Sequence, residues 1–165
     1  MKSNRKPEAD FALINIGQLL TMAPGDGPKR GQDARDLGVL ENAFLASRDG
    51  KIVALGPNPS LQNEVDLLEN ARVVDAGRRV VAPGFVDAHT HLVFGGWRYE
   101  EYALRCQGAS YLEIAQRGGG IMSTVRATRN ASKEELLERS LGFLDEMLRN
   151  GTTSCETKSG YGLDL

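Results

Sequence analysis

The chain has 165 residues, of which 41% are hydrophobic and 25% are charged, the composition of an ordinary globular protein. Its 20 lysines and arginines against 22 aspartates and glutamates give a net charge of −2, so no basic field favours nucleic acid or an anionic membrane as a partner. The two cysteines, Cys106 and Cys155, lie far apart in the sequence, which fits a reducing compartment and excludes a thiolate metal cluster.

The N-terminus combines basic residues with an apolar run from Phe11 to Met22, the outline of a secretory signal. Asn15, Gly17 and Gln18 interrupt that run, whereas a signal requires an uninterrupted apolar core. No stretch approaches the roughly 18 apolar residues of a membrane span. We therefore expect a soluble, cytoplasmic protein.

The first half of the chain is predicted to be rich in β-structure. Asp49-Gly50 lies between two apolar runs and indicates a hairpin turn, and Gly77 indicates a second tight turn. Residues 24–36 are polar and rich in turn formers, which predicts a surface loop. The predicted strands are residues 10–16, 43–47, 51–56, 72–76 and 79–81. Residues 1–82 are therefore predicted to form a small β module of the sandwich type.

From residue 83 onward the pattern changes to alternating strands and helices. Residues 85–91 predict a short buried strand that runs into a loop at Gly95-Gly96. A second strand is predicted over residues 152–158, followed by a turn at residues 159–162. Two strands separated by a helical crossover form a parallel βα arrangement, so residues 83–165 are predicted to be α/β.

A helix is predicted from Ser132 to about Asn150. Ser132 and Glu135 match a capping box, and Gly151 is placed to end the helix. An apolar stripe runs along the segment, formed by Leu137, Leu141, Leu144 and Leu148. The charged residues of the segment are expected to form its solvated face.

His89 and His91 are the only histidines of the chain and lie at the end of a predicted strand. Residues two apart on a strand share a face, so both imidazoles can reach one divalent cation, zinc or iron. A catalytic zinc site normally has three protein ligands, so further ligands must come from carboxylates or from chain not present. Asp87 lies on the same face of the predicted strand as the two histidines. We hypothesise that it accepts a hydrogen bond that orients one of them. A bare His-x-His is more often two ordinary histidines, and its context must decide.

Other residues have a functional and a plainer interpretation. Arg98 could hold a substrate carboxylate through paired hydrogen bonds, although an exposed arginine is usually a surface residue. Tyr161 lies in a glycine-flanked turn and could face the histidines, although loop tyrosines usually pack. Gly118-Gly119-Gly120 lacks nucleotide-binding spacing, which favours a flexible or close-packed loop. Glu156 and Lys158 share a strand face and could form an internal ion pair or lie near the site, and the ion pair is the favoured interpretation.

Several blocks of sequence resemble a known family. Residues 83–91, which read Pro-Gly-Phe-Val-Asp-Ala-His-Thr-His, resemble the first-strand signature of the amidohydrolase superfamily. Residues 91–98, 108–121 and 156–162 are similar to the imidazolonepropionase family within it. Ala88 and Trp97 depart from the usual family residues at positions not expected to be catalytic, and residues 1–82 match only in general pattern.

The resemblance implies a metal-dependent hydrolysis of 4-imidazolone-5-propanoate to N-formimidoyl-L-glutamate, a step of histidine breakdown. It implies that His89 and His91 bind one divalent metal, zinc or iron, and that Arg98 and Tyr161 bind the small-molecule substrate. It also implies a TIM-like (β/α)8 barrel that is incomplete in this chain. The remaining ligands and the acid/base carboxylate are expected beyond Leu165, so the chain alone is expected to be inactive. The full-length family members are commonly dimers.

Two alternatives stay open. One is another cyclic amidohydrolase or deaminase that shares the His-x-His strand but does not use Arg98 to bind a carboxylate. The other is a noncatalytic fragment that acts as a binding or assembly module. Activity with and without Arg98 separates the first alternative from the predicted hydrolase. A reading frame that continues beyond Leu165 with another histidine and a late aspartate would favour the enzyme, and one that ends there would favour the second alternative.

Overall fold

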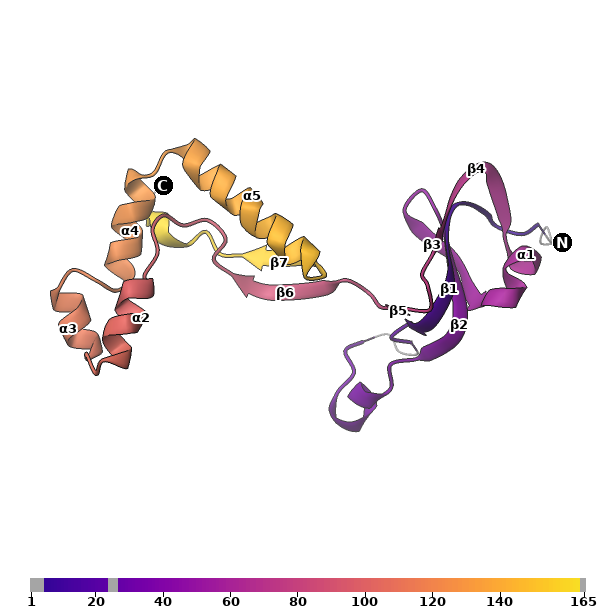
Figure 1. Ribbon diagram of the computed structural model, residues 1–165, viewed down its shortest axis with the longest axis horizontal. Helices are drawn as coiled ribbons and strands as arrows, with labels where there is room; N and C mark the ends of the chain where they lie inside the picture. Colours follow the sequence, from indigo (N-terminus) through magenta and orange to yellow (C-terminus); the bar gives the residue numbers. More distant parts are fainter. Residues whose placement is uncertain (1–4, 24–26, 164–165) are drawn as a thin grey trace. The chain divides into compact units, whose positions relative to one another are not determined.

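The computed structural model describes residues 5–23 and 27–163, and it divides into two compact units, Met1–Pro83 and Gly84–Leu165. Figure 1 shows the elements of each unit. The predicted surface loop at residues 24–36 contains a short 3-10 turn, η1 (Gly31–Arg35), and its first three residues lie outside the described part.

The first unit is built on one five-stranded sheet. Its strands are β1 (Glu8–Leu20), β2 (Val39–Arg48), β3 (Lys51–Pro57), β4 (Asp66–Asp75) and β5 (Val80–Val81). They lie in the order β3-β2-β1-β4, with β5 also paired to β1. β2 and β3 form the antiparallel hairpin predicted around Asp49-Gly50. The turn η2 (Asn58–Ser60) and the short helix α1 (Leu61–Glu64) connect β3 to β4. A second sheet to complete a sandwich remains a prediction.

Both faces of this sheet carry buried side chains. Phe44 and Ala46 pack with Ala9 and Val65, whereas Ala43, one residue before Phe44, packs on the opposite face. The second cluster consists of Ile16, Leu19, Ala43 and Ala76. The alternation along β2 therefore accounts for two small cores, one on each face.

β4 and β5 lie one after the other along the same edge of β1, and both run parallel to it. A tight turn is present at Gly77, as predicted, where φ is +58°. A β-carbon at Gly17 would come within 2.1 Å of the Arg78 carbonyl oxygen. β1 therefore needs glycine at the position where this turn lies against it. The chain therefore keeps its direction through this turn and continues along β1 from β4 to β5.

The second unit contains two parallel strands, β6 (Phe85–Thr90) and β7 (Thr152–Thr157), which lie side by side in Figure 1. The predicted parallel pairing is confirmed. The prediction that the first strand is buried is wrong for this chain, because Phe85 is 65% and Val86 71% exposed. The exposure has a simple cause: among the described residues, β6 pairs only with β7.

Four helices lie between the two strands. They are α2 (Tyr99–Cys106), α3 (Tyr111–Gln116), α4 (Ile121–Asn130) and α5 (Lys133–Arg149), and the turn η3 (Gly160–Gly162) follows β7. The sequence analysis predicted only α5. A signal for α3 was present, because Ser110 and Glu113 form a complete capping box.

The predicted helix α5 and its capping box are confirmed. The Ser132 hydroxyl accepts the Glu135 N–H at 3.1 Å, and the Glu135 carboxylate accepts the Ser132 N–H at 2.8 Å. Gly151 follows the helix with φ +91°. The apolar stripe is exposed in this chain, with Leu137, Leu141 and Leu148 each more than half exposed, and Ser140 is the buried residue of the helix.

Replacing Ser132 with alanine is expected to lower the free energy of unfolding by about 1 kcal/mol at pH 7. The hydrogen bonds from the Ser132 backbone and side chain hold the pKa of Glu135 below its ordinary value of 4.5. The stability that this carboxylate adds is therefore present above pH 4.5 and is lost as the pH falls through the lowered pKa. The difference in the free energy of unfolding between the Ser132→Ala variant and the parent chain should therefore become smaller in acid.

Urea unfolding followed by circular dichroism at several pH values measures this effect. Ser123→Ala is the matched control, because Ser123 lies inside α4, where alanine is the better helix former. Equal losses of stability for the two variants would contradict the role of the capping box.

Candidate active site

The two histidines project from the carboxyl end of β6. His89 lies in the strand and His91 follows directly after it. Their ring centroids are 5.4 Å apart, with the ring planes at 61°. The two imidazoles are therefore close neighbours, as their spacing on one strand face predicts.

The segment after His91 is held in place by two helices. The Gly95 N–H donates to the Thr128 hydroxyl of α4 at 2.9 Å, and the Phe94 carbonyl accepts from the Arg139 guanidinium of α5 at 3.1 Å. A β-carbon at Gly95 would come within 2.4 Å of the Ala127 carbonyl oxygen. Glycine at this position thus lets the segment touch the backbone of α4.

Tyr161 lies in the turn η3, beside the histidines. Its ring centroid is 5.2 Å from that of His91. The guanidinium of Arg129 in α4 donates to the carbonyls of Gly162 at 2.8 Å and Leu163 at 3.1 Å. Contacts with α4 therefore fix the turn that carries the tyrosine.

One cavity of about 230 Å³ brings three of the four predicted site residues together. His91, Arg98 and Tyr161 all line it, and His89 lies beside His91. The remaining lining residues are Phe94, Gly96, Trp97 and Thr124. Residues from the loop after β6, from α4 and from the turn after β7 thus meet at one place.

The sequence analysis missed the aromatic wall of this cavity. The rings of Phe94 and Trp97 meet edge to face at 5.3 Å, and Phe94 also stacks on Phe143 of α5 at 5.7 Å. From the sequence, Trp97 is only a departure from the family pattern. The aromatic residues on either side of Gly95-Gly96 were the signal that could have identified the wall.

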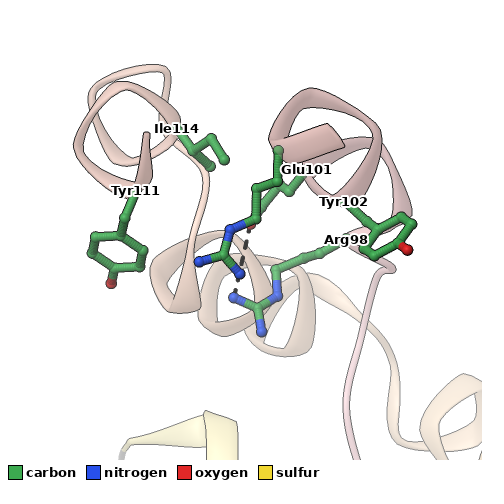
Figure 2. A pocket seen from close by; sticks show the side chains of 6 residues that line it. Arg98, Glu101, Tyr102, Tyr111 and Ile114 are labelled. Atoms are coloured by element: carbon green, nitrogen blue, oxygen red, sulfur yellow. Dashed lines mark ion pairs between the residues drawn. The ribbon is translucent and has the colours of Figure 1, made fainter. Parts of the chain in front are cut away.

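Arg98 lies immediately before α2 and lines a second cavity of about 180 Å³, shown in Figure 2. Its side chain is 40% exposed, and its Nη1 atom is 3.9 Å from the Glu101 carboxylate. Glu101, Tyr102, Arg105, Tyr111 and Ile114 complete the lining. Arg98 thus borders both this cavity and the one that contains His91 and Tyr161.

The carboxylates near the histidines make other contacts. One oxygen of Asp87 accepts the backbone N–H of His89 at 3.2 Å. Glu156 and Lys158 form the predicted ion pair at 2.8 Å, and both side chains are about half exposed. Within residues 5–23 and 27–163, no group of three or more histidine, cysteine, aspartate or glutamate side chains could hold a metal ion.

Solved structures define the class of fold. The chain superimposes on an adenosine deaminase from Xanthomonas campestris with bound zinc, with a TM-score of 0.63, 23% identity and coverage of 93% of this chain and 30% of that one. A prolidase complexed with N-methylphosphonate-L-proline gives a TM-score of 0.50, 23% identity and coverage of 88% and 24%. The chain thus has an α/β fold that is also found in part of each of these two enzymes.

Sequence relatives point to one family in that class. Imidazolonepropionase from Symbiobacterium thermophilum is 53% identical over 156 residues, and that from Solibacter usitatus is 48% identical over 157 residues. The matches cover 94% and 95% of this chain but only 36% and 37% of the relatives. No protein-family model matches the chain. The similarity to imidazolonepropionases, first indicated by the sequence blocks, is confirmed.

None of the helices that the structure describes is both long and apolar enough to cross a bilayer.

Proposed function

We propose that this chain supplies part of the active site of a metal-dependent imidazolonepropionase, which opens the cyclic amide of 4-imidazolone-5-propanoate. The observation that carries the proposal is the cavity shared by His91, Arg98 and Tyr161, with His89 beside it. A substrate with a heterocyclic amide at one end and a carboxylate at the other needs a metal site and a cationic site close together. The cavity offers both kinds of residue.

The geometry of the two histidines fits a shared metal. Two imidazoles could hold one ion only if their rings are close neighbours. The observed separation is 5.4 Å. We infer that His89 and His91 bind one zinc or iron ion, and the zinc in the Xanthomonas campestris neighbour supports this choice of chemistry.

His89 and His91 would hold this ion, which when bound would supply the activation of a water molecule and the polarisation of the substrate carbonyl. The residues of this chain would orient the substrate for that attack. The guanidinium of Arg98 binds the propionate through charge-assisted hydrogen bonds. The hydroxyl of Tyr161 fixes the other end of the substrate near His91, while Phe94 and Trp97 give the cavity an apolar wall.

A catalytic metal site needs more ligands than His89 and His91, and the described residues contain no group of three that could hold a metal. We propose that Gly84–Leu165 begins a TIM-like barrel and that later strands supply the other ligands and the acid/base carboxylate. Exposed side chains on β6, such as Phe85 and Val86, are compatible with further strands. Activity is therefore tested in a completed enzyme, in which these 165 residues are followed by the rest of the Symbiobacterium thermophilum sequence. A homodimeric assembly and a cytoplasmic location remain predictions.

Replacing Arg98 with alanine in the completed enzyme is expected to raise KM by roughly 10- to 100-fold, because hydrogen bonds to a charged group contribute about 1.5–3 kcal/mol. Loss of substrate absorbance in the ultraviolet measures the rate. Arg105→Ala is the matched control, because Arg105 lines only the neighbouring cavity.

Each outcome selects one function. If the completed enzyme is active and its KM does not change when Arg98 is replaced, the result would favour another cyclic amidohydrolase or deaminase of the superfamily. No turnover by the completed enzyme, with zinc or iron added, would contradict the proposal. The 165-residue chain alone is expected to show no turnover above background and serves as the reference.

A further inference from the structure

The carboxylate of Glu101 connects two parts of the second unit. Glu101 lies in α2, one helical turn after Arg98, and its side chain is 20% exposed. One carboxylate oxygen, Oε1, accepts the Gly120 N–H at 2.8 Å. The other, Oε2, faces Arg98 Nη1 at 3.9 Å (Figure 2). The same side chain therefore binds the start of α4 and pairs with the proposed substrate-binding arginine.

The glycine segment before α4 is shaped around this carboxylate. A β-carbon at Gly119 would come within 2.9 Å of Glu101 Oε1 and 2.7 Å of the Ile114 side chain. Gly120 has φ +74°, a conformation that favours glycine. Gly118-Gly119-Gly120 is thus a close-packed loop, one of the two interpretations left open by its sequence. Its packing anchors the Glu101 carboxylate independently of Arg98.

An anchored carboxylate can limit where the arginine points. A free arginine side chain samples many rotamers, and ordering it on binding reduces affinity. The guanidinium has five N–H donors, and Glu101 faces only Nη1, so other donors stay available to a ligand. Arg98 also lines the cavity that contains His91 and Tyr161.

We propose that Glu101 is a positioning residue that holds the Arg98 guanidinium in place to receive the carboxylate of the substrate. This inference rests on the proposed function, because it assigns Arg98 to a substrate carboxylate. Glu101 does not touch the substrate. Its charge acts through Arg98, and its second oxygen is fixed by the Gly120 N–H.

The test uses Glu101→Gln in the completed enzyme. Glutamine keeps the shape of the side chain and an oxygen that can accept the Gly120 N–H, but it removes the charge that faces Arg98. With 4-imidazolone-5-propanoate, we expect KM to rise roughly 3- to 10-fold and kcat to stay within about twofold. With the corresponding propanamide, which lacks the carboxylate, KM should not change.

Two further variants test whether Glu101 acts through Arg98. In the Arg98→Ala background, adding Glu101→Gln should have no further effect on KM, because the group it positions is gone. Glu100→Gln is the matched control, because Glu100 is the neighbouring carboxylate on α2 and forms no ion pair with Arg98 among the described residues. An equal effect of Glu101→Gln on the acid and the amide would overturn the inference, as would an undiminished effect without Arg98.

Binding provides a readout that does not need turnover. Imidazole-4-propionate carries the same carboxylate on a ring that is not hydrolysed, and its Kd can be measured by calorimetry. Glu101→Gln should weaken its binding 3- to 10-fold, and only when Arg98 is present. If the completed enzyme shows this dependence of binding on Glu101 and Arg98 but no turnover, only the proposal that it is a hydrolase is contradicted. If the enzyme is active but binding does not depend on Glu101 in this way, only the proposed role of Glu101 is contradicted.

Discussion

Replacing either His89 or His91 with alanine is expected to remove the bound metal from the completed enzyme and to lower kcat/KM by at least about 1,000-fold. Loss of a group that merely orients a ligand typically costs 10- to 100-fold in metal affinity or activity, and loss of a ligand itself should cost more. The chain has no other histidine that could take over. The metal content of dialysed protein, determined by elemental analysis, is the primary measurement.

Val93→Ala is the control for these two variants. Val93 lies two residues after His91 and is 39% exposed, so its truncation alters the same loop without touching an imidazole. The control should retain the metal. Histidine variants that keep a full equivalent of metal, or that lose it no more readily than the Val93 variant, would show that the pair is structural.

Features determined by near neighbours in the sequence could be predicted. The capping box at Ser132, the hairpin at Asp49-Gly50 and the turn at Gly77 each depend on a few adjacent residues, and each is present. The spacing of His89 and His91 belongs to this group, since a shared face follows from strand geometry alone.

Features determined by distant contacts were not predicted. The exposure of β6 depends on how many strands flank it, which its own apolar sequence does not state. The leucine stripe of α5 is predicted from the sequence, but the spacing of the leucines does not show whether another element covers them. α2 and α4 lack the capping-box signal that precedes α5, and their sequences are short.

The candidate site divides in the same way. Arg98 and Tyr161 could be proposed only because separate blocks resembled a family, since each alone is an ordinary surface or loop residue. Their meeting in one cavity requires η3 to be held against α4 by Arg129, a contact between residues more than 30 positions apart. Sequence spacing contains no information about such a contact.

Gly95→Ala is expected to lower the free energy of unfolding of the completed enzyme by about 2–3 kcal/mol. The new methyl group would meet the Ala127 carbonyl carbon at 2.6 Å and the Thr128 Cα at 2.8 Å, both backbone atoms that cannot turn aside. Overpacking of this kind typically costs 1–3 kcal/mol. The displaced loop would also weaken the hydrogen bond from Gly95 to Thr128, which contributes about 1 kcal/mol.

The same substitution should reduce catalysis, because Arg98 lies three residues further along the displaced loop. Gly142→Ala is the matched control: Gly142 lies in α5 with open space around it, and alanine there should stabilise the protein by about 0.5–1 kcal/mol. Urea unfolding and kcat/KM are measured on both variants. If Gly95→Ala is as stable and active as Gly142→Ala, close contact between the loop and α4 does not hold the site together. A stable but inactive Gly95 variant would instead show that the contact positions Arg98 without contributing to folding.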